Sequence, residues 1–155
     1  MSPHVAAIQL CSQDIIQDNL QAVERGLIAA QQQSVDLVVL PENFACFAAG
    51  KQRQTAQQFD HIVATLKQYA ARYQCWLVAG TIPCPYRPNG QIVADGRVRA
   101  TSLCIDPAGQ IVGRYDKIHL FDVQVSDAVG GYQESKFFEP GTDVVVAKTP
   151  FGNIG

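Results

Sequence analysis

The sequence predicts an α/β layered domain whose first strands are parallel neighbours. Short apolar runs of strand length alternate with segments whose apolar residues recur every three or four positions. Between residues 5 and 80 the order is strand, helix, strand, helix, strand, which favours parallel neighbours joined by right-handed crossovers. A chain of 155 residues suits one domain with a hydrophobic core of its own.

The first half of the chain provides three expected strands and two expected helices. The strands are short, mostly apolar and expected to be buried, at 5–10, 36–40 and 75–80. The first helix has one apolar stripe with spacings of four and three, formed by Ile16, Leu20, Val23, Leu27 and Ala30. The second helix is expected at 55–73, with the stripe Phe59, Ile62, Leu66, Tyr69 and Tyr73.

The second half is less regular. Prolines and glycines after Thr81 predict a long loop. Two apolar runs, at 100–105 and 110–115, flank the segment Asp106-Pro107-Ala108-Gly109, which predicts a β-hairpin. Residues 116–141 show little periodicity, and a loop of that length inside a compact domain is more often functional than idle. A strand is expected at 143–147, followed at 149–155 by a turn that leads into one more strand.

Composition and charge narrow the class of partner. The chain is 47% hydrophobic and 17% charged, which is typical of globular proteins, and its formal net charge is −2. The charges are scattered without a run of one sign, so neither nucleic acid nor a membrane surface is an expected partner. No apolar stretch has the length of a membrane span, and the N-terminus lacks a secretory leader. We therefore expect a cytoplasmic protein with a small-molecule partner.

The cysteines indicate neither a disulfide framework nor a metal site. They are five in number, an odd count, and they stand at irregular intervals. There is no CxxC pair and no Cys/His spacing that suits zinc. A reducing cytoplasm is consistent with this pattern.

Charged residues stand at three loop edges, the places where α/β proteins build their sites. Glu42 directly follows a strand, and Lys117 lies just past another. Glu134 and Glu139 bracket an aromatic pair before a Pro-Gly turn, so one of these two carboxylates could point inward. Each residue alone is more simply interpreted as a solvated surface charge. Only their combination predicts a site.

Together, LPENF at 40–44, RYDKIHLFD at 114–122 and QESKFFEPG at 133–141 resemble the motifs of the nitrilase superfamily of carbon–nitrogen hydrolases. The opening VAAIQL and the closing TPFGNIG fit as well. The resemblance implies that residues 1–155 form a C-terminally incomplete carbon–nitrogen hydrolase domain, the N-terminal portion of a four-layer α-β-β-α sandwich. KIHLFD followed by QES is most similar to the Nit-type ω-amidases, whereas EPG after two aromatics is also similar to the carbamoylases.

The resemblance also implies a role for each charged residue. Glu42 would be the general base, Lys117 would stabilise the oxyanion, and Glu134 would help to position the substrate and the lysine. A buried glutamate would take the proton of a cysteine thiol, the thiolate would attack an amide carbonyl, and ammonia would leave before water hydrolyses the thioester. The implied substrate is a small linear ω-amide. No metal or organic cofactor is implied, and the full-length protein would form a homo-oligomer, such as a homodimer.

None of the five cysteines stands in the sequence context in which this family carries its nucleophilic cysteine. In the family, the cysteine follows the closing glycine-rich strand, and here that strand ends at Gly155. Cys46 is close to Glu42, but its apolar setting lacks a basic neighbour to activate the thiol, so it is interpreted as a packing residue. His119 is expected to shape the pocket wall.

We therefore expect the chain alone to be inactive, with its cysteine beyond Gly155 and with one apolar sheet face exposed. The alternative is a non-catalytic binding or assembly module that retains half of the nitrilase-like fold.

Overall fold

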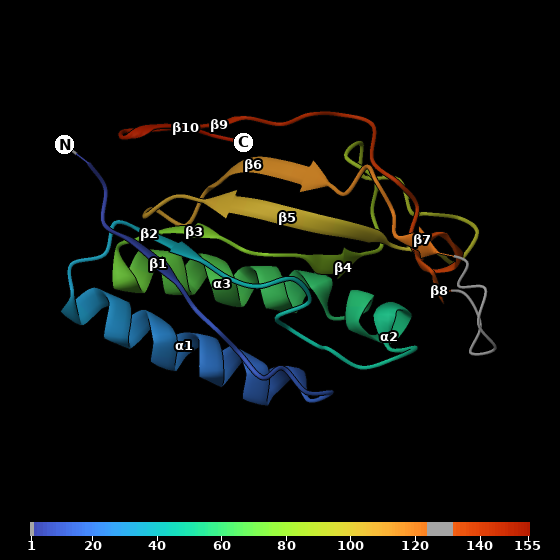
Figure 1. Ribbon diagram of the computed structural model, residues 1–155, viewed down its shortest axis with the longest axis horizontal. Helices are drawn as coiled ribbons and strands as arrows, with labels where there is room; N and C mark the ends of the chain where they lie inside the picture. Colours follow the sequence, from blue (N-terminus) through green and yellow to red (C-terminus); the bar gives the residue numbers. More distant parts are fainter. Residues whose placement is uncertain (1, 124–131) are drawn as a thin grey trace.

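A computed structural model describes residues 2–123 and 132–155 of the chain. Its centre is a six-stranded sheet with the order β1-β2-β3-β5-β4, in which β6 pairs with the remaining edge of β5. The strands of this sheet are β1 (Val5–Ala7), β2 (Leu37–Val39), β3 (Trp76–Val78), β4 (Ile82–Cys84), β5 (Arg99–Ile105) and β6 (Ile111–Asp116). Figure 1 shows the sheet above a layer of helices.

The parallel strands predicted between residues 5 and 80 are confirmed, and the rest of the sheet is antiparallel. β1, β2 and β3 are parallel, whereas β5 runs antiparallel to β3, β4 and β6. The parallel strands are joined through helices, which supply the long crossover that parallel neighbours need. No helix separates β3 from β5 or β5 from β6, and the β5–β6 hairpin confirms the predicted turn at 106–109.

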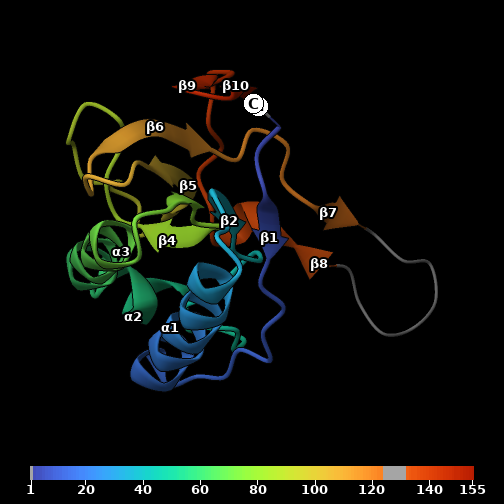
Figure 2. The same cartoon turned by 90° about the vertical axis from the view of Figure 1, so that its left-hand side faces the viewer.

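The helices pack on one face of the sheet, as the apolar stripes predict. They are α1 (Ile16–Gln32), α2 (Gln52–Ala56) and α3 (Phe59–Tyr73), and Figures 1 and 2 show all three on the same side. Fully buried residues of α1 and α3 join buried residues of the strands in one core, which includes Val23, Leu27, Ile62, Leu66, Val38, Leu77 and Ile105. Burial of these side chains is the main stabilising contribution to the fold.

The single second helix predicted at 55–73 is interrupted. α2 ends at Ala56 and α3 begins at Phe59, and the two helices pack against different groups of residues. Phe59 belongs to the main core, whereas Ala56 packs in a smaller cluster with Val98, Ala100 and Phe138. The chain therefore bends between the two helices so that both apolar contacts can be made.

The long loop predicted after Thr81 contains a strand that the prolines obscured. β4 includes Pro83, and among the described strands it pairs only with β5. Proline cannot donate a hydrogen bond from its backbone, and an edge strand leaves one side of its backbone without a partner, so Pro83 is tolerated there.

The face of the sheet away from the helices is partly exposed, as expected. Val5 of β1 is 56% exposed, which contradicts the prediction of a buried first strand, and Ile111 of β6 is 43% exposed. The antiparallel pair β9 (Ala147–Thr149) and β10 (Gly152–Ile154) lies on this side of the sheet (Figures 1 and 2). The strand that ends the chain is confirmed.

The strand predicted at 143–147 is wrong except for its last residue. Val144 is 84% exposed, and β9 begins only at Ala147. Valine-rich segments have high strand propensity, but this propensity depends on packing and on a partner strand, and residues 143–146 pair with none of the described strands.

Of the helices in the described part of the chain, none has both the length and the apolar character that a membrane crossing requires.

A pair of neighbouring residues on α1 tests the assigned core. Leu27 is fully buried and Ile28 is 42% exposed. Leu27→Ala should lower the free energy of unfolding by about 2–5 kcal/mol, because it leaves a cavity against α3 and the sheet. Ile28→Ala should change it by less than about 1 kcal/mol, because little buried surface is lost. Urea denaturation measures both, and equal losses would contradict the placement of α1.

Candidate active site

The three residues singled out from the sequence line one cavity. Glu42, Lys117 and Glu134 border a space of about 780 Å³. The other lining residues are Asn43, Cys46, Phe47, Ala48, Ala49, Gly50, Lys51, Gln52, Thr55, Pro83, Phe121, Tyr132, Phe137 and Phe138. The walls are therefore largely apolar and aromatic, with a small number of charged groups, which is typical of a small-molecule site.

Glu42 is placed by a tight contact between the segments that follow β2 and β3. It begins a turn at 42–45, where Asn43 has a φ of 54° and its backbone N–H donates to Thr81 Oγ1 at 3.0 Å. Gly80 lies so close to Pro41 that a Cβ atom on Gly80 would be 1.9 Å from the Pro41 carbonyl oxygen. Glycine is therefore required at position 80 if Glu42 is to hold its place.

The turn after Glu42 is also anchored to the helix layer. The buried side chain of Asn19, on α1, donates to the carbonyl oxygen of Ala45 at 2.8 Å. Ser12 Oγ donates to the carbonyl oxygen of Phe44 at 2.8 Å. Phe44 itself is fully buried. These contacts fix the backbone that follows Glu42 against α1 and the segment that precedes it.

Lys117 follows β6 directly, and its backbone is held on both sides. Its N–H donates to Ala100 at 2.9 Å, and its carbonyl accepts from the N–H of Gly141 at 2.9 Å. A Cβ atom on Gly141 would be only 2.1 Å from the carbonyl oxygen of Asp116. Because Gly141 has no side chain, the backbone at Gly141 can lie directly against the backbone of Asp116 and Lys117.

Glu134 begins a short 3₁₀ turn, η1 (Glu134–Lys136), inside the segment predicted to be an aperiodic functional loop. The turn follows the antiparallel pair of β7 (Asp122–Val123) and β8 (Tyr132–Gln133), while residues 124–131 of that loop lie outside the described residues. The Glu134 carboxylate accepts a hydrogen bond from the backbone N–H of Phe121 at 2.6 Å. The pairing of β7 with β8 and the hydrogen bond from Phe121 thus place the Glu134 carboxylate at the cavity.

The ammonium group of Lys117 joins the other two residues. Its Nζ lies 2.9 Å and 3.0 Å from the two oxygens of Glu134 and 3.3 Å from Oε1 of Glu42. Partial burial acts to lower the pKa of the Lys117 ammonium group. The hydrogen bonds and negative charges of Glu134 and Glu42 outweigh burial and raise that pKa above its ordinary value. Lys117 therefore remains a cation throughout the neutral range.

The two carboxylates differ in their exposure to solvent. The side chain of Glu134 is 7% exposed, whereas that of Glu42 is 56% exposed. The burial that the sequence interpretation expected of Glu42 is therefore not found. Glu42 presents its carboxylate to the open cavity, and only its contact with Lys117 restrains it among the described residues.

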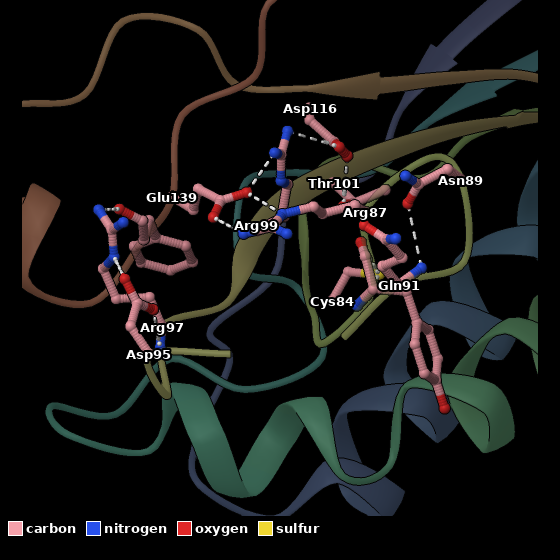
Figure 3. Close-up of polar contacts among 12 residues, drawn as sticks. Cys84, Arg87, Asn89, Gln91, Asp95, Arg97, Arg99, Thr101, Asp116 and Glu139 are labelled. Atoms are coloured by element: carbon pink, nitrogen blue, oxygen red, sulfur yellow. Dashed lines mark hydrogen bonds and ion pairs between the residues drawn. The ribbon is translucent and has the colours of Figure 1, made fainter. Parts of the chain in front are cut away.

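Glu139, the second acid of the motif at 133–141, contacts arginines and not Lys117. Arg87 and Arg99 contact Glu139, and Arg99 also contacts Asp116 (Figure 3). Arg114 is a second partner of Asp116. Hydrogen bonds from Arg87 and then Arg99 lower the pKa of Glu139 to about 2, although partial burial opposes them. The sequence interpretation missed this cluster of charges. Its signal in the sequence was Arg99 directly before the apolar run expected at 100–105, because an arginine buried with such a strand requires carboxylates nearby.

Four of the five cysteines are buried, and one of these four lines the cavity. Burial raises the pKa of Cys75 to about 11 and also raises the pKa of Cys84 and Cys104. Cys11 is exposed. Cys46 alone among the five lines the cavity, where it is 8% exposed and its sulfur lies 3.9 Å from the carbonyl oxygen of Asp14.

His119 does not shape the wall of this cavity, contrary to the prediction. It lines a separate space of about 470 Å³ on the far face of the sheet, together with Val78 and Tyr115. Within residues 2–123 and 132–155, no three or more His, Cys, Asp or Glu side chains are grouped so as to hold a metal ion.

Comparison with known proteins gives one family for nearly the whole chain. The carbon–nitrogen hydrolase family matches residues 4–155. The deaminated glutathione amidase of Yersinia enterocolitica is 36% identical over 98% of this chain and 52% of its own length. The omega-amidase of Danio rerio is 29% identical over 97% of this chain and 52% of its own length. The chain thus spans about half the length of these curated relatives.

Solved structures share the fold. The crystal structure of the C. elegans NitFhit protein superposes with a TM-score of 0.83 and 26% identity, over 100% of this chain and 38% of that one. Nit3 of Saccharomyces cerevisiae, a member of the nitrilase superfamily, superposes with a TM-score of 0.75 and 24% identity, over 96% of this chain and 52% of that one. These likenesses confirm the predicted nitrilase-type α/β fold.

The contacts of Lys117 predict unequal effects of its two partners. Glu134→Gln should lower the pKa of Lys117 more than Glu42→Gln does, because Glu134 makes two contacts and is shielded from solvent. Nuclear magnetic resonance of the Lys117 side chain during a pH titration measures this. Glu24→Gln, which removes a carboxylate bound to Arg72 and Tyr73 on the helix layer, is the control. An equal or larger fall in Glu42→Gln would refute the assignment of Glu134 as the main partner.

The pKa of Glu139 predicts a defined acid lability. A carboxyl group with a folded pKa of about 2 and an ordinary value of 4.5 stabilises the fold fully above pH 4.5. That contribution is lost as the pH falls from 4.5 towards 2. Glu139→Gln should therefore be less stable than the wild type at pH 7, and the difference should shrink over this acid range. Urea unfolding at a series of pH values measures the effect, and a pH-independent difference would contradict it.

Proposed function

The chain belongs to the carbon–nitrogen hydrolase family, and we propose that it forms the part of an amidase that supplies the general base and the oxyanion-stabilising lysine. The observation that carries this proposal is the position of the Lys117 ammonium group between two carboxylates in one cavity. A glutamate base beside a lysine that remains charged suits the hydrolysis of an amide through a covalent intermediate.

In the proposed mechanism, Glu42 takes the proton of a cysteine thiol. Its carboxylate is open to the cavity, where both a thiol and water can reach it. The thiolate attacks the carbonyl carbon, and the Lys117 ammonium group stabilises the negative charge that develops on the carbonyl oxygen. Glu42 then returns its proton to the leaving ammonia and activates water, which hydrolyses the thioester.

Glu134 has a supporting role in this proposal. Its buried carboxylate keeps Lys117 charged and directs the ammonium group into the cavity. Because it also accepts the backbone hydrogen bond of Phe121, its orientation is restrained at both oxygens. Such support of a reacting group by a fixed neighbour is a common feature of active sites.

We place the nucleophilic cysteine outside these 155 residues. Three cysteines are buried with a raised pKa, and Cys11 does not line the cavity. Cys46 lines the cavity, but in the described structure its thiol contacts a backbone carbonyl and neither Glu42 nor Lys117. These positions equally support a second candidate function, a binding module that retains the fold and the cavity without catalysis.

The cavity favours a small linear amide with a carboxylate at its far end. Lys51 lines the space, and its ammonium group is hydrogen-bonded only to Gln54 among the described residues, so its charge is available to an anionic group. The aromatic walls suit the apolar stem of such a substrate. The relatives named as deaminated glutathione amidase and omega-amidase support an amide as the class of substrate.

The test begins with the source gene beyond codon 155. A cysteine codon shortly downstream, in a protein that releases ammonia from succinamate, would support the amidase. Glu42→Gln and Lys117→Met should each reduce this hydrolysis by about a hundredfold or more, because each removes a group that acts in the transition state. Glu24→Gln is the matched control and should keep full activity. Lys51→Gln should raise KM for succinamate and leave KM for butyramide unchanged.

One outcome would overturn the amidase, and another would overturn the role of Lys117. A stop codon directly after codon 155 would leave only the binding module, and full activity in Lys117→Met would exclude the proposed oxyanion role. Ammonia release by the 155-residue chain alone, lost in Cys46→Ser, would instead move the nucleophile to Cys46.

A further inference from the structure

The segments that carry Lys117 and Glu134 are joined beside the cavity by one arginine. Arg99 lies on β5, its side chain is 10% exposed, and its guanidinium group lies between the carboxylates of Asp116 and Glu139 (Figure 3). Its Nη1 is 3.3 Å from Asp116 Oδ2, and its Nη2 donates to Glu139 Oε1. Both contacts are charge-assisted and shielded from water, so they restrain geometry strongly.

Each of these carboxylates belongs to the same chain segment as one functional residue. Asp116 precedes Lys117 in the chain, its carboxylate is 3% exposed, and it accepts a hydrogen bond from Thr101 at 2.7 Å. Glu139 follows the 3₁₀ turn that begins at Glu134, and its backbone N–H donates to Val98 at 2.8 Å. A shift of either carboxylate would therefore move the backbone on which Lys117 or Glu134 stands.

The other two arginines of the cluster do not make this bridge. Arg87 contacts Glu139 at 2.8 and 2.9 Å, and Arg114 contacts Asp116 at 3.1 and 3.2 Å. Among the described residues, Arg99 alone contacts both carboxylates, and its buried Nε has no hydrogen-bond partner. The orientation of the Arg99 guanidinium group therefore depends on its contacts with Asp116 and Glu139.

We propose that Arg99 is a positioning residue that sets the separation between the Lys117 ammonium group and the Glu134 carboxylate by bridging Asp116 and Glu139. Its importance for hydrolysis rests on the proposed amidase function. Its effect on the geometry does not, because the separation exists whether or not the chain is part of an enzyme.

The charges of the cluster allow a matched comparison. Three arginines face two carboxylates, so removal of any one arginine leaves two cations and two anions. In Arg99→Met these form two separate pairs, Arg87 with Glu139 and Arg114 with Asp116, and the bridge is gone. In Arg87→Met and Arg114→Met the bridge remains. Each of the three variants loses one positive charge, but only Arg99→Met loses the bridge between Asp116 and Glu139.

The direction of change in the pKa of Lys117 separates positioning from charge. Loss of a nearby cation by itself stabilises the Lys117 cation and raises its pKa. Loss of the bridge weakens the contact between Lys117 and Glu134, and this lowers the pKa. A general loss of stability moves the pKa in neither direction as long as the protein is folded.

The experiment is a pH titration of the Lys117 side chain by nuclear magnetic resonance in the wild type and the three variants. We expect the pKa to fall in Arg99→Met and to stay constant or rise in Arg87→Met and Arg114→Met. A change of the same sign in all three variants would overturn the proposal. Arg99→Lys, which keeps the charge but cannot reach two carboxylates with a planar fork, should also lower the pKa.

A second comparison keeps the proposal testable if Arg99→Met does not fold. Asp116→Asn and Glu139→Gln, singly and together, should affect the pKa of Lys117 non-additively when Arg99 is present, because both break one bridge. Additive effects, or a wild-type pKa in Arg99→Lys, would overturn the positioning role.

The same variants then separate this inference from the function. In an active protein that includes the nucleophile, Arg99→Lys should lower kcat about ten- to a hundredfold with little change in KM. A protein without amidase activity but with the expected pKa changes would reject the proposed function and leave the bridge established. Unchanged kcat together with unchanged pKa values would reject the positioning role alone.

Discussion

The ion pair between Lys117 and Glu134 is the interaction on which the arrangement of the site depends. The Glu134 side chain is 7% exposed, and a carboxylate that is so well shielded needs a cation and hydrogen-bond donors to compensate for the loss of water. Lys117 and the backbone of Phe121 provide both. Because Lys117 also contacts Glu42, the pair brings together three segments that are far apart in the sequence. The cavity is the space that these segments enclose.

Backbone contacts determine how closely those segments approach. Gly80 lies against Pro41 next to Glu42, and Gly141 lies against Asp116 next to Lys117. In each case a side chain would collide with a carbonyl oxygen, so the glycine provides room that no other residue can provide. Asp116 is also part of the charge cluster around Arg99. The positions of the functional residues therefore follow from contacts at their neighbours as much as from their own side chains.

The central sheet is apolar along most of the face that packs against the helices and polar at one end of β5. Over most of the sheet, apolar residues face α1 and α3 and form the main core. At Arg99 and Thr101 the inward positions of β5 become polar, and the side chains there bind Asp116 and Glu139 rather than helices. A stable apolar body thus carries a polar end in which arginines pair with carboxylates, and such pairing is one way in which a rigid fold can support a reactive site.

The sequence determined the elements whose signal is local. Apolar spacing predicted α1 and all of α3, because periodicity reports which side of a helix is buried. Short apolar runs predicted the strands of the parallel half, and turn residues between two such runs predicted the β5–β6 hairpin. The motifs predicted Glu42, Lys117 and Glu134 as members of one site, and all three line one cavity. Tertiary structure alone decided that Glu139 meets Arg87 and Arg99, why a strand containing Pro83 is tolerated, and why residues 143–146 form no strand. Periodicity encodes burial but not the identity of a distant partner, and ion pairs and strand pairing both depend on which segments the completed fold places side by side.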